Sequence, residues 1–291
     1  MAKIVCMVSL PLIIIVNAGA ALHEPFPQGY AMGNLGTIVT ENGPGGHLPL
    51  FPAAYLDDSL FVGVAASVTT YYDDMDNFSD RHLATIVGGG WLVVRRIGIK
   101  AGISHFDALG AYREQSGYFS FAVNTIRGIR IGTELSGTRL LLPSSDGAVK
   151  TLGEAGFTLF VPIRIISCAV SIDHLTVKPT RSEGADQSLR IRCGVHTMAN
   201  AFGAQGVRID ITPQYEHPVS IAIGQEFRFS RYFALHGAVA NNPLFVGLGV
   251  AVFLRNGCAS AALVNHPVLG WSRGFGAEYG WKGPGRKKTV N

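Results

Sequence analysis

Charged side chains with a regular spacing offer the clearest chemistry in this sequence. In several short segments they occupy every second position, as where Arg208 and Asp210 alternate with Val207 and Ile209. Residues two apart lie on one face of a β-strand, so these groups should gather on one surface. Arginine on such a surface can hold a carboxylate through two parallel hydrogen bonds. The candidate residues are Arg130, Glu134, Arg190, Arg192, Arg208, Asp210, Glu226, Arg228 and Glu278.

The mixed signs of this set allow two interpretations. Opposite charges on neighbouring strands can form cross-strand ion pairs that fill and rigidify a narrow interior. Alternatively, the arginines line a path for an anionic head group such as a carboxylate. Arg190 and Arg192 point the same way on one strand and are the best pair for that role. Carboxylate partners for every arginine would favour the first interpretation.

Metal-binding, phosphate-binding and catalytic patterns are incomplete. The acidic segment 73–80 offers carboxylates to a hard cation, but without EF-hand spacing, so we expect a solvated loop. Gly88-Gly89-Gly90 lacks the lysine of a phosphate loop, and such glycines more often mark tight packing against an interior element. Asp173-His174 and His82 invite comparison with barrel hydrolases, but no nucleophile elbow or HExxH motif accompanies them. We expect no metal, no cofactor and no enzymatic activity.

The start of the chain has the pattern of a secretory signal peptide. Lys3 precedes the apolar run Val8–Val16, and Ala18-Gly19-Ala20 forms a small-residue cleavage site, which defines residues 1–20. The run is too short for a membrane-spanning helix. Only 15% of the 291 residues are charged, which is low for a soluble domain. The basic residues are dispersed, which argues against nucleic acid as a partner.

The mature sequence reads as short segments of period two, which predicts an all-β protein. We expect about fourteen antiparallel strands closed into a transmembrane up-and-down barrel over residues 59–282. Apolar rows such as Val62, Val64 and Val68 would face lipid, while small or charged rows face the lumen. A soluble periplasmic β-protein also alternates and stays an alternative. The expected strands are 59–71, 82–94, 96–106, 115–125, 127–140, 151–161, 163–175, 187–198, 205–215, 217–229, 231–240, 243–255, 257–266 and 270–282.

Aromatic residues and connection lengths give the barrel a direction. Trp271 lies near one end of the last expected strand and Tyr279 and Trp281 near the other, as in the aromatic girdles of membrane barrels. Long polar connections follow odd strands and short ones follow most even strands, as expected for extracellular loops and periplasmic turns. Residues 283–291 would form a periplasmic tail. Three cysteines, Cys168, Cys193 and Cys258, show no disulfide or metal spacing and are expected to fill space in the wall.

Residues 21–58 are rich in glycine and proline and carry short motifs. Their sequence resembles the start of the PorV/PorQ-like outer-membrane barrels, which are related to FadL-type transporters of hydrophobic compounds. In that group a glycine segment precedes an Asn-Pro-Ala motif and the first strand, and here Phe51 stands in place of the asparagine. The residues that carry the resemblance are Met32, Gly33, Gly36, Phe51, Pro52 and Ala53.

The resemblance implies an outer-membrane barrel whose N-terminal segment lies in or near the lumen. A FadL-like role would be the passage or uptake of hydrophobic small molecules. A PorV-like role would be that of a secretion-system component that binds exported proteins at the cell surface. A structural barrel without transport is the third possibility. In each case the expected surroundings are outer-membrane lipid.

The segment 21–58 is either a periplasmic leader or a plug in the barrel mouth. If it is a plug, deleting residues 24–54 should change the conductance of the barrel in a planar bilayer, because the deletion opens the lumen. Conductance equal to that of the full chain would count against a plug.

Overall fold

A computed structural model shows fourteen β-strands in its described part. It describes residues 61–71, 83–94, 96–108, 112–125, 128–141, 149–163, 166–178, 189–197, 203–213, 219–242, 244–266 and 270–282. The strands are β1 (Phe61–Tyr71), β2 (Leu83–Val94), β3 (Ile97–Ala108), β4 (Tyr112–Asn124), β5 (Arg130–Leu141), β6 (Val149–Ile163), β7 (Ile166–Lys178), β8 (Arg190–Thr197), β9 (Gln205–Ile211), β10 (Val219–Ser230), β11 (Phe233–Ala240), β12 (Phe245–Phe253), β13 (Gly257–His266) and β14 (Gly270–Lys282).

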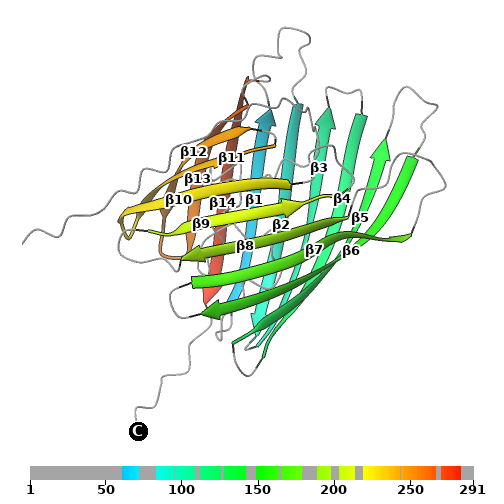
Figure 1. The fold of residues 1–291 in the computed structure, drawn as a ribbon, viewed down its shortest axis with the longest axis horizontal. Coiled ribbons are helices and arrows are strands. Elements are labelled where there is room, and N and C mark those ends of the chain that lie inside the picture. Colours follow the sequence, from blue (N-terminus) through cyan, green and yellow to red (C-terminus); the bar gives the residue numbers. More distant parts are fainter. Residues whose placement is uncertain are drawn as a thin grey trace, which may run out of the picture.

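The strands form one closed antiparallel barrel (Figure 1). Each strand pairs with its neighbours in sequence, and β1 closes the ring by pairing with β14 from Phe61–Lys282 to Thr70–Arg273. The predicted fold class and the fourteen strands are therefore confirmed. In the described ranges, the chain has no helix of the length and apolarity that crossing a membrane would need.

Two of the strand ends that differ from the prediction lie beside a residue whose backbone chemistry interrupts the alternation. β9 ends at Ile211 rather than at 215, and Pro213, which has no N–H for a ladder, follows closely. β5 begins at Arg130 rather than at 127, because Gly128 has a φ of 78° and belongs to the turn. In that turn the Gly128 N–H donates to the Thr125 carbonyl at 3.2 Å.

Burial along the strands is the reverse of that in a soluble protein. Outward positions are apolar and exposed, with Ile103 at 70% and Leu248 at 58% exposure. Inward positions include buried polar groups such as Thr69, Ser171 and Glu226. A soluble sandwich would bury its apolar row, so this arrangement excludes that alternative and gives the barrel a lipid-facing exterior.

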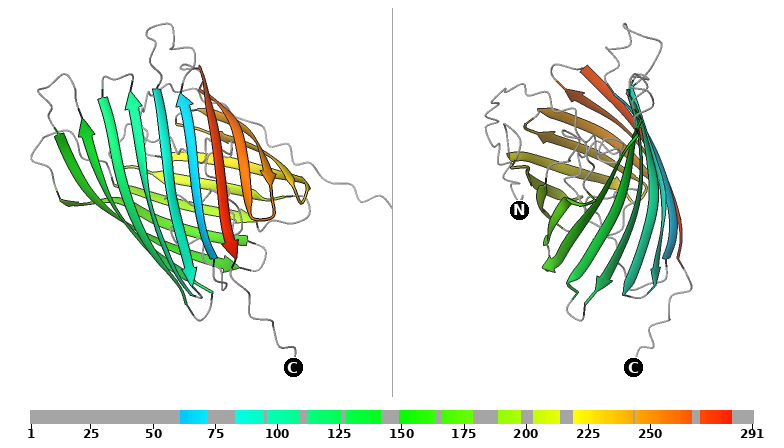
Figure 2. Two further views of the ribbon diagram at one scale, coloured as in Figure 1. Left: turned by 180° about the vertical axis from the view of Figure 1, so that it is seen from behind. Right: turned by 90° about the vertical axis from the view of Figure 1, so that its right-hand side faces the viewer.

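Consecutive strands run in opposite directions, so odd-numbered and even-numbered strands end at opposite rims of the barrel (Figure 2). Odd-numbered strands end at the rim that we call the outer rim. The connections 72–82, 142–148 and 179–189 belong to this rim and are long. Even-numbered strands end at the other, the inner rim, where most turns are short, as at 231–232. The start of β1 and the end of β14 both lie at the inner rim, as expected for the periplasmic side of such a barrel.

The aromatic candidates lie on the exterior of β14, at both of its ends. Trp271 is near the outer rim, and Tyr279 and Trp281 are near the inner rim. The rings of Tyr279 and Trp281 meet edge to face with centroids 4.6 Å apart. At about 3.4 Å per residue and a tilt of about 45°, Trp271 and Trp281 are separated by roughly 24 Å across the bilayer. That separation is close to the apolar band of about 25 Å in outer-membrane barrels.

Several predictions concern residues outside the described part of the chain. They are the signal peptide at 1–20, the segment 21–58 with Met32, Gly33, Gly36, Phe51, Pro52 and Ala53, the acidic segment 73–80, and the tail 283–291. These stay predictions.

The lipid-facing exterior can be tested with one charge. Leu248→Arg, near the middle of β12, should lower the free energy of unfolding in lipid vesicles by about 2–4 kcal/mol, because the guanidinium would lie near the bilayer midplane. Asn256→Arg, in an exposed turn at the inner rim, is the control and should change it by less than about 1 kcal/mol. Equal effects in a denaturant titration would contradict a membrane-embedded β12.

Candidate functional site

The charged residues predicted to share one surface all occupy inward positions. Arg190, Arg192, Arg208, Asp210 and Glu226 are buried. Arg130, Glu134, Arg228 and Glu278 are partly buried. The lumen face is therefore rich in charge, and the roles of these residues depend on what each one contacts.

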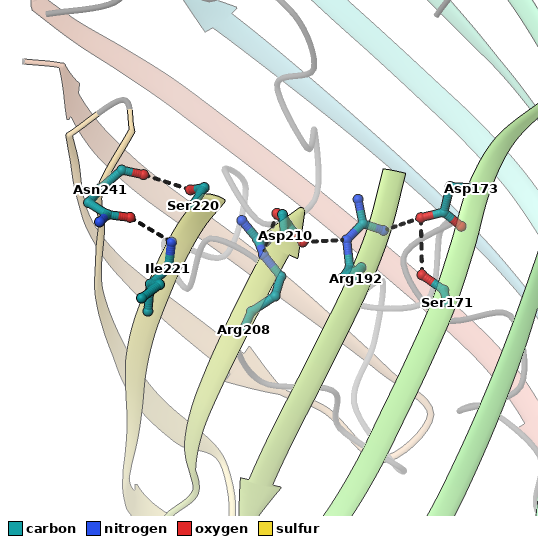
Figure 3. A network of polar contacts seen from close by, with 8 residues as sticks. All are labelled: Ser171, Asp173, Arg192, Arg208, Asp210, Ser220, Ile221 and Asn241. Atoms are coloured by element: carbon teal, nitrogen blue, oxygen red, sulfur yellow. Dashed lines mark hydrogen bonds and ion pairs between the residues drawn. The ribbon is translucent and has the colours of Figure 1, made fainter. Parts of the chain in front are cut away.

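A ladder of alternating charges crosses β7, β8 and β9 (Figure 3). Arg192 Nη1 lies 3.1 Å from Asp173 Oδ2, and Arg192 Nε lies 3.0 Å from Asp210 Oδ1. Arg208 Nε lies 3.0 Å from the second oxygen of Asp210. Ser171 Oγ donates to Asp173 Oδ2 at 3.0 Å. Two carboxylates and two guanidinium groups thus neutralise one another inside the barrel.

This ladder favours the ion-pair interpretation over the anion clamp. Arg192 was one of the two best clamp candidates, but carboxylates contact its guanidinium from both sides. Arg190 faces Asp173 across the β7–β8 pairing and also has interaction partners. Asp173, compared above with hydrolase residues, belongs to this network. An incoming anion would have to displace these carboxylates.

A second cluster joins β10, β11 and β12 in the half of the lumen near the inner rim. Glu226 Oε1 accepts hydrogen bonds from Arg228, with Nε at 3.2 Å and Nη2 at 3.1 Å. Glu226 Oε2 lies 3.9 Å from His236 Nδ1. The Arg228 guanidinium lies over the Phe253 ring, 5.0 Å from its centroid. His236 was not predicted, although its parity with Ala234 and Ala238 placed it on the inward row.

A third cluster surrounds Lys100 on β3, which was also not predicted. The side chain is buried and interacts electrostatically with Glu134 and Glu278. Lys100 pairs in register with Ser120, which in turn pairs with Glu134. Ile99 beside it is exposed, so parity alone could have placed Lys100 in the lumen.

Aromatic side chains lie on the glycines of the wall. A Cβ added to Gly102 or Gly89 would collide with the Tyr118 hydroxyl, and one added to Gly63 would collide with the Trp91 ring. Of the segment Gly88-Gly89-Gly90, Gly89 packs against the Tyr118 side chain, while packing of residues 21–58 against this segment stays a prediction outside the described residues. The Tyr118 and Trp91 side chains thus pack into the space that these glycines leave free because they have no Cβ.

An apolar cluster occupies the lumen near the outer rim, and we call it the apolar mouth. Ala222, Ala238, Ala240 and Val264 form its buried core, and Phe106 and Phe245 pack against it. The core and Phe245 come from β10 to β13, whereas Phe106 comes from β3, which β2, β1 and β14 separate from β13. The apolar mouth thus connects two sectors of the barrel wall.

Other reactive groups in the described part of the chain are dispersed. No group of three potential metal ligands is found among these residues. Cys168, Cys193 and Cys258 are free thiols, of which Cys258 is buried. Their positions within β7, β8 and β13 agree with residues that fill space in the wall.

Solved structures share this architecture, although sequence comparisons find nothing. No protein-family model and no curated protein matches the sequence. The Pseudomonas putida toluene transporter TodX matches with a TM-score of 0.59 and 8% identity, over 88% of this chain and 97% of TodX. A TodX deltaS2S3 mutant, described as a monoaromatic hydrocarbon channel, matches with a TM-score of 0.55 and 10% identity, over 82% of this chain and 94% of the mutant. A triple mutant of Rhodopseudomonas blastica porin matches with a TM-score of only 0.43 and 9% identity, over 76% of this chain and 99% of the porin.

The chain has an outer-membrane barrel fold. At these identities the likeness to TodX concerns the fold alone, and the likeness to the porin is too weak to carry an argument. The expected relation to FadL-type barrels is supported at the level of the fold. The relation to PorV/PorQ-like proteins stays a prediction.

The charge ladder predicts a specific response to mutation. Arg192→Gln should lower the free energy of unfolding by about 3–5 kcal/mol, because it leaves the partly buried Asp173 and the buried Asp210 without their shared cation. Adding Asp173→Asn should restore much of that loss, because Asp210 keeps its ion pair with Arg208. Denaturant titration in vesicles measures both. A variant as stable as the parent protein would contradict the structural role of Arg192.

Proposed function

We propose that this protein is an outer-membrane channel for uncharged hydrophobic small molecules. The observation that supports it most is the apolar mouth, where Phe106 and Phe245 pack on a core of small apolar residues at the rim of the long connections. Binding sites for small apolar ligands are concave and lined mainly by hydrophobic and aromatic side chains. A hydrophobic molecule arriving from the cell exterior would meet this cluster first.

The charges of the lumen support an uncharged rather than an anionic ligand. The guanidinium of Arg192 is held by two carboxylates, and Arg208 shares one of them. An anionic head group would gain little from cations that are already paired, because it must break those contacts first. The ladder therefore serves as a rigid support beside the mouth.

Location and mechanism follow from the same features. The lipid-facing exterior, the inner-rim position of both barrel ends and the signal-peptide pattern support export to an outer membrane. Passage would be non-enzymatic and would consist of binding at the apolar mouth followed by diffusion. TodX is a toluene transporter and its deltaS2S3 mutant is described as a monoaromatic hydrocarbon channel, which makes an aromatic hydrocarbon the first probe to use.

The proposal predicts a localised loss of binding. Phe245→Ala should weaken equilibrium binding of radiolabelled toluene to the detergent-solubilised full chain by roughly tenfold, because the ligand loses much of an aromatic contact. Phe253→Ala is the matched control, since Phe253 ends the same strand at the opposite rim and contacts Arg228. It should change affinity less than twofold.

Two outcomes would contradict the proposal. If the folded protein shows no saturable toluene binding, the proposal is contradicted. If the two variants reduce the affinity equally, the apolar mouth is not the site where toluene binds. Native mass spectrometry of the protein extracted from its own membrane adds an independent test. A stable protein partner without a small hydrophobic ligand would favour the PorV-like secretion role. If the protein carries neither a partner nor a ligand, a structural barrel is favoured.

A further inference from the structure

Two neighbouring turns at the inner rim each expose an arginine. Arg231 lies between β10 and β11, and Arg255 lies between β12 and β13. The Phe253 N–H donates to the Tyr232 carbonyl at 2.8 Å, which holds the two turns side by side. The Gly280 N–H donates to the Asn256 carbonyl at 2.7 Å, which joins the second turn to the end of β14.

These bonds gather one contiguous surface, which we call the arginine corner. Its members are Arg231, Tyr232, Leu254, Arg255 and Trp281, and all of them are exposed. Leu254 is 66% exposed, so lipid-facing character extends into the turn. Tyrosine and tryptophan concentrate at the level of lipid head groups, where one side of the ring meets hydrocarbon and the other meets water. The arginine corner therefore lies at head-group depth.

Within the described part of the chain, no carboxylate neutralises the charge of the arginine corner. The Arg231 guanidinium lies over the Tyr232 ring, 4.6 Å from its centroid. Within the described ranges, neither Arg231 nor Arg255 forms an ion pair with a carboxylate. The acidic residues of the nearest strands, Glu226 and Glu278, occupy inward positions.

An arginine toward the other rim shows the opposite arrangement. Arg113 on the exterior of β4 forms an ion pair with Asp107, with Nε and Oδ2 2.9 Å apart. Arg113 on the exterior therefore has a carboxylate partner, whereas among the described residues Arg231 and Arg255 have none. A guanidinium at head-group depth without an internal partner is suited to bind a phosphate through parallel hydrogen bonds.

We propose that the arginine corner binds the phosphate of an anionic phospholipid in the leaflet that meets the inner rim. The two guanidinium groups contact the lipid phosphate, while Leu254 and Trp281 contact its glycerol region and upper acyl chains. This site lies outside the lumen, and its existence does not depend on which molecule the channel passes.

The test compares lipid retention by matched arginine variants. The full chain is purified in detergent micelles doped with dioleoylphosphatidylglycerol, and native mass spectrometry measures the apparent affinity for that lipid. Arg231→Gln with Arg255→Gln should reduce the affinity about tenfold or more, since each basic group near the surface contributes several-fold. Arg113→Gln with Arg139→Gln removes the same charge from the exterior near the outer rim and should reduce it less than twofold. Dioleoylphosphatidylcholine should bind all three proteins weakly and equally.

Folding of each variant is checked by heat-modifiable migration in gels. If the double variant does not fold, Arg255→Gln replaces it, because the Arg255 side chain makes no hydrogen bond, ion pair or ring contact with another described residue. An unchanged affinity for phosphatidylglycerol in the corner variant would overturn the proposal. Equal losses in the corner and control variants would also overturn it, because they would show a general effect of net charge.

Discussion

The closing pair of β1 and β14 is the constraint on which the rest of this structure depends. Lipid offers no hydrogen-bond partners, so every backbone N–H and C=O at membrane depth must find one within the chain. An open sheet of these strands would leave two unpaired edges, and the pairing from Phe61–Lys282 to Thr70–Arg273 removes both. Closure with an even number of hairpin-connected strands then places the start of β1 and the end of β14 at the same rim.

Closure also decides what the interior must contain. With lipid outside, the polar residues of each strand turn inward, where they need partners of their own. The ladder of Asp173, Arg192, Asp210 and Arg208 meets that need by pairing charges across three strands. At some glycines of the wall an aromatic side chain lies against the backbone, as Tyr118 does on Gly102. Most inward side chains therefore contact one another and stabilise the barrel, and a ligand of the proposed channel would contact only the lumen surface that remains.

The sequence predicts the strands and their faces because both depend on local alternation. It predicts poorly which side chains contact one another, because these contacts depend on the register between strands and on the closure of the barrel. The pairing of β7 with β8 sets Ser171 opposite Arg192 and Asp173 opposite Arg190, and alternation within each strand does not specify this register, so it could not place Asp173 next to Arg192. Lys100 and His236 could have been found by parity alone. Strand ends were missed where Pro213 and Gly128 act through backbone properties.

The apolar mouth is the feature that local pattern could not reveal at all. Phe106 on β3 packs against a cluster from β10 to β13, so the contact exists only once the ring has closed. In sequence, Phe106 is one inward aromatic among polar neighbours. The contact also limits how tightly the mouth can hold a ligand. A hydrophobic molecule entering between Phe106 and the cluster replaces one apolar contact with another, so only the additional buried area contributes to affinity. Weak binding of this kind would suit the proposed channel, because its ligand must also leave.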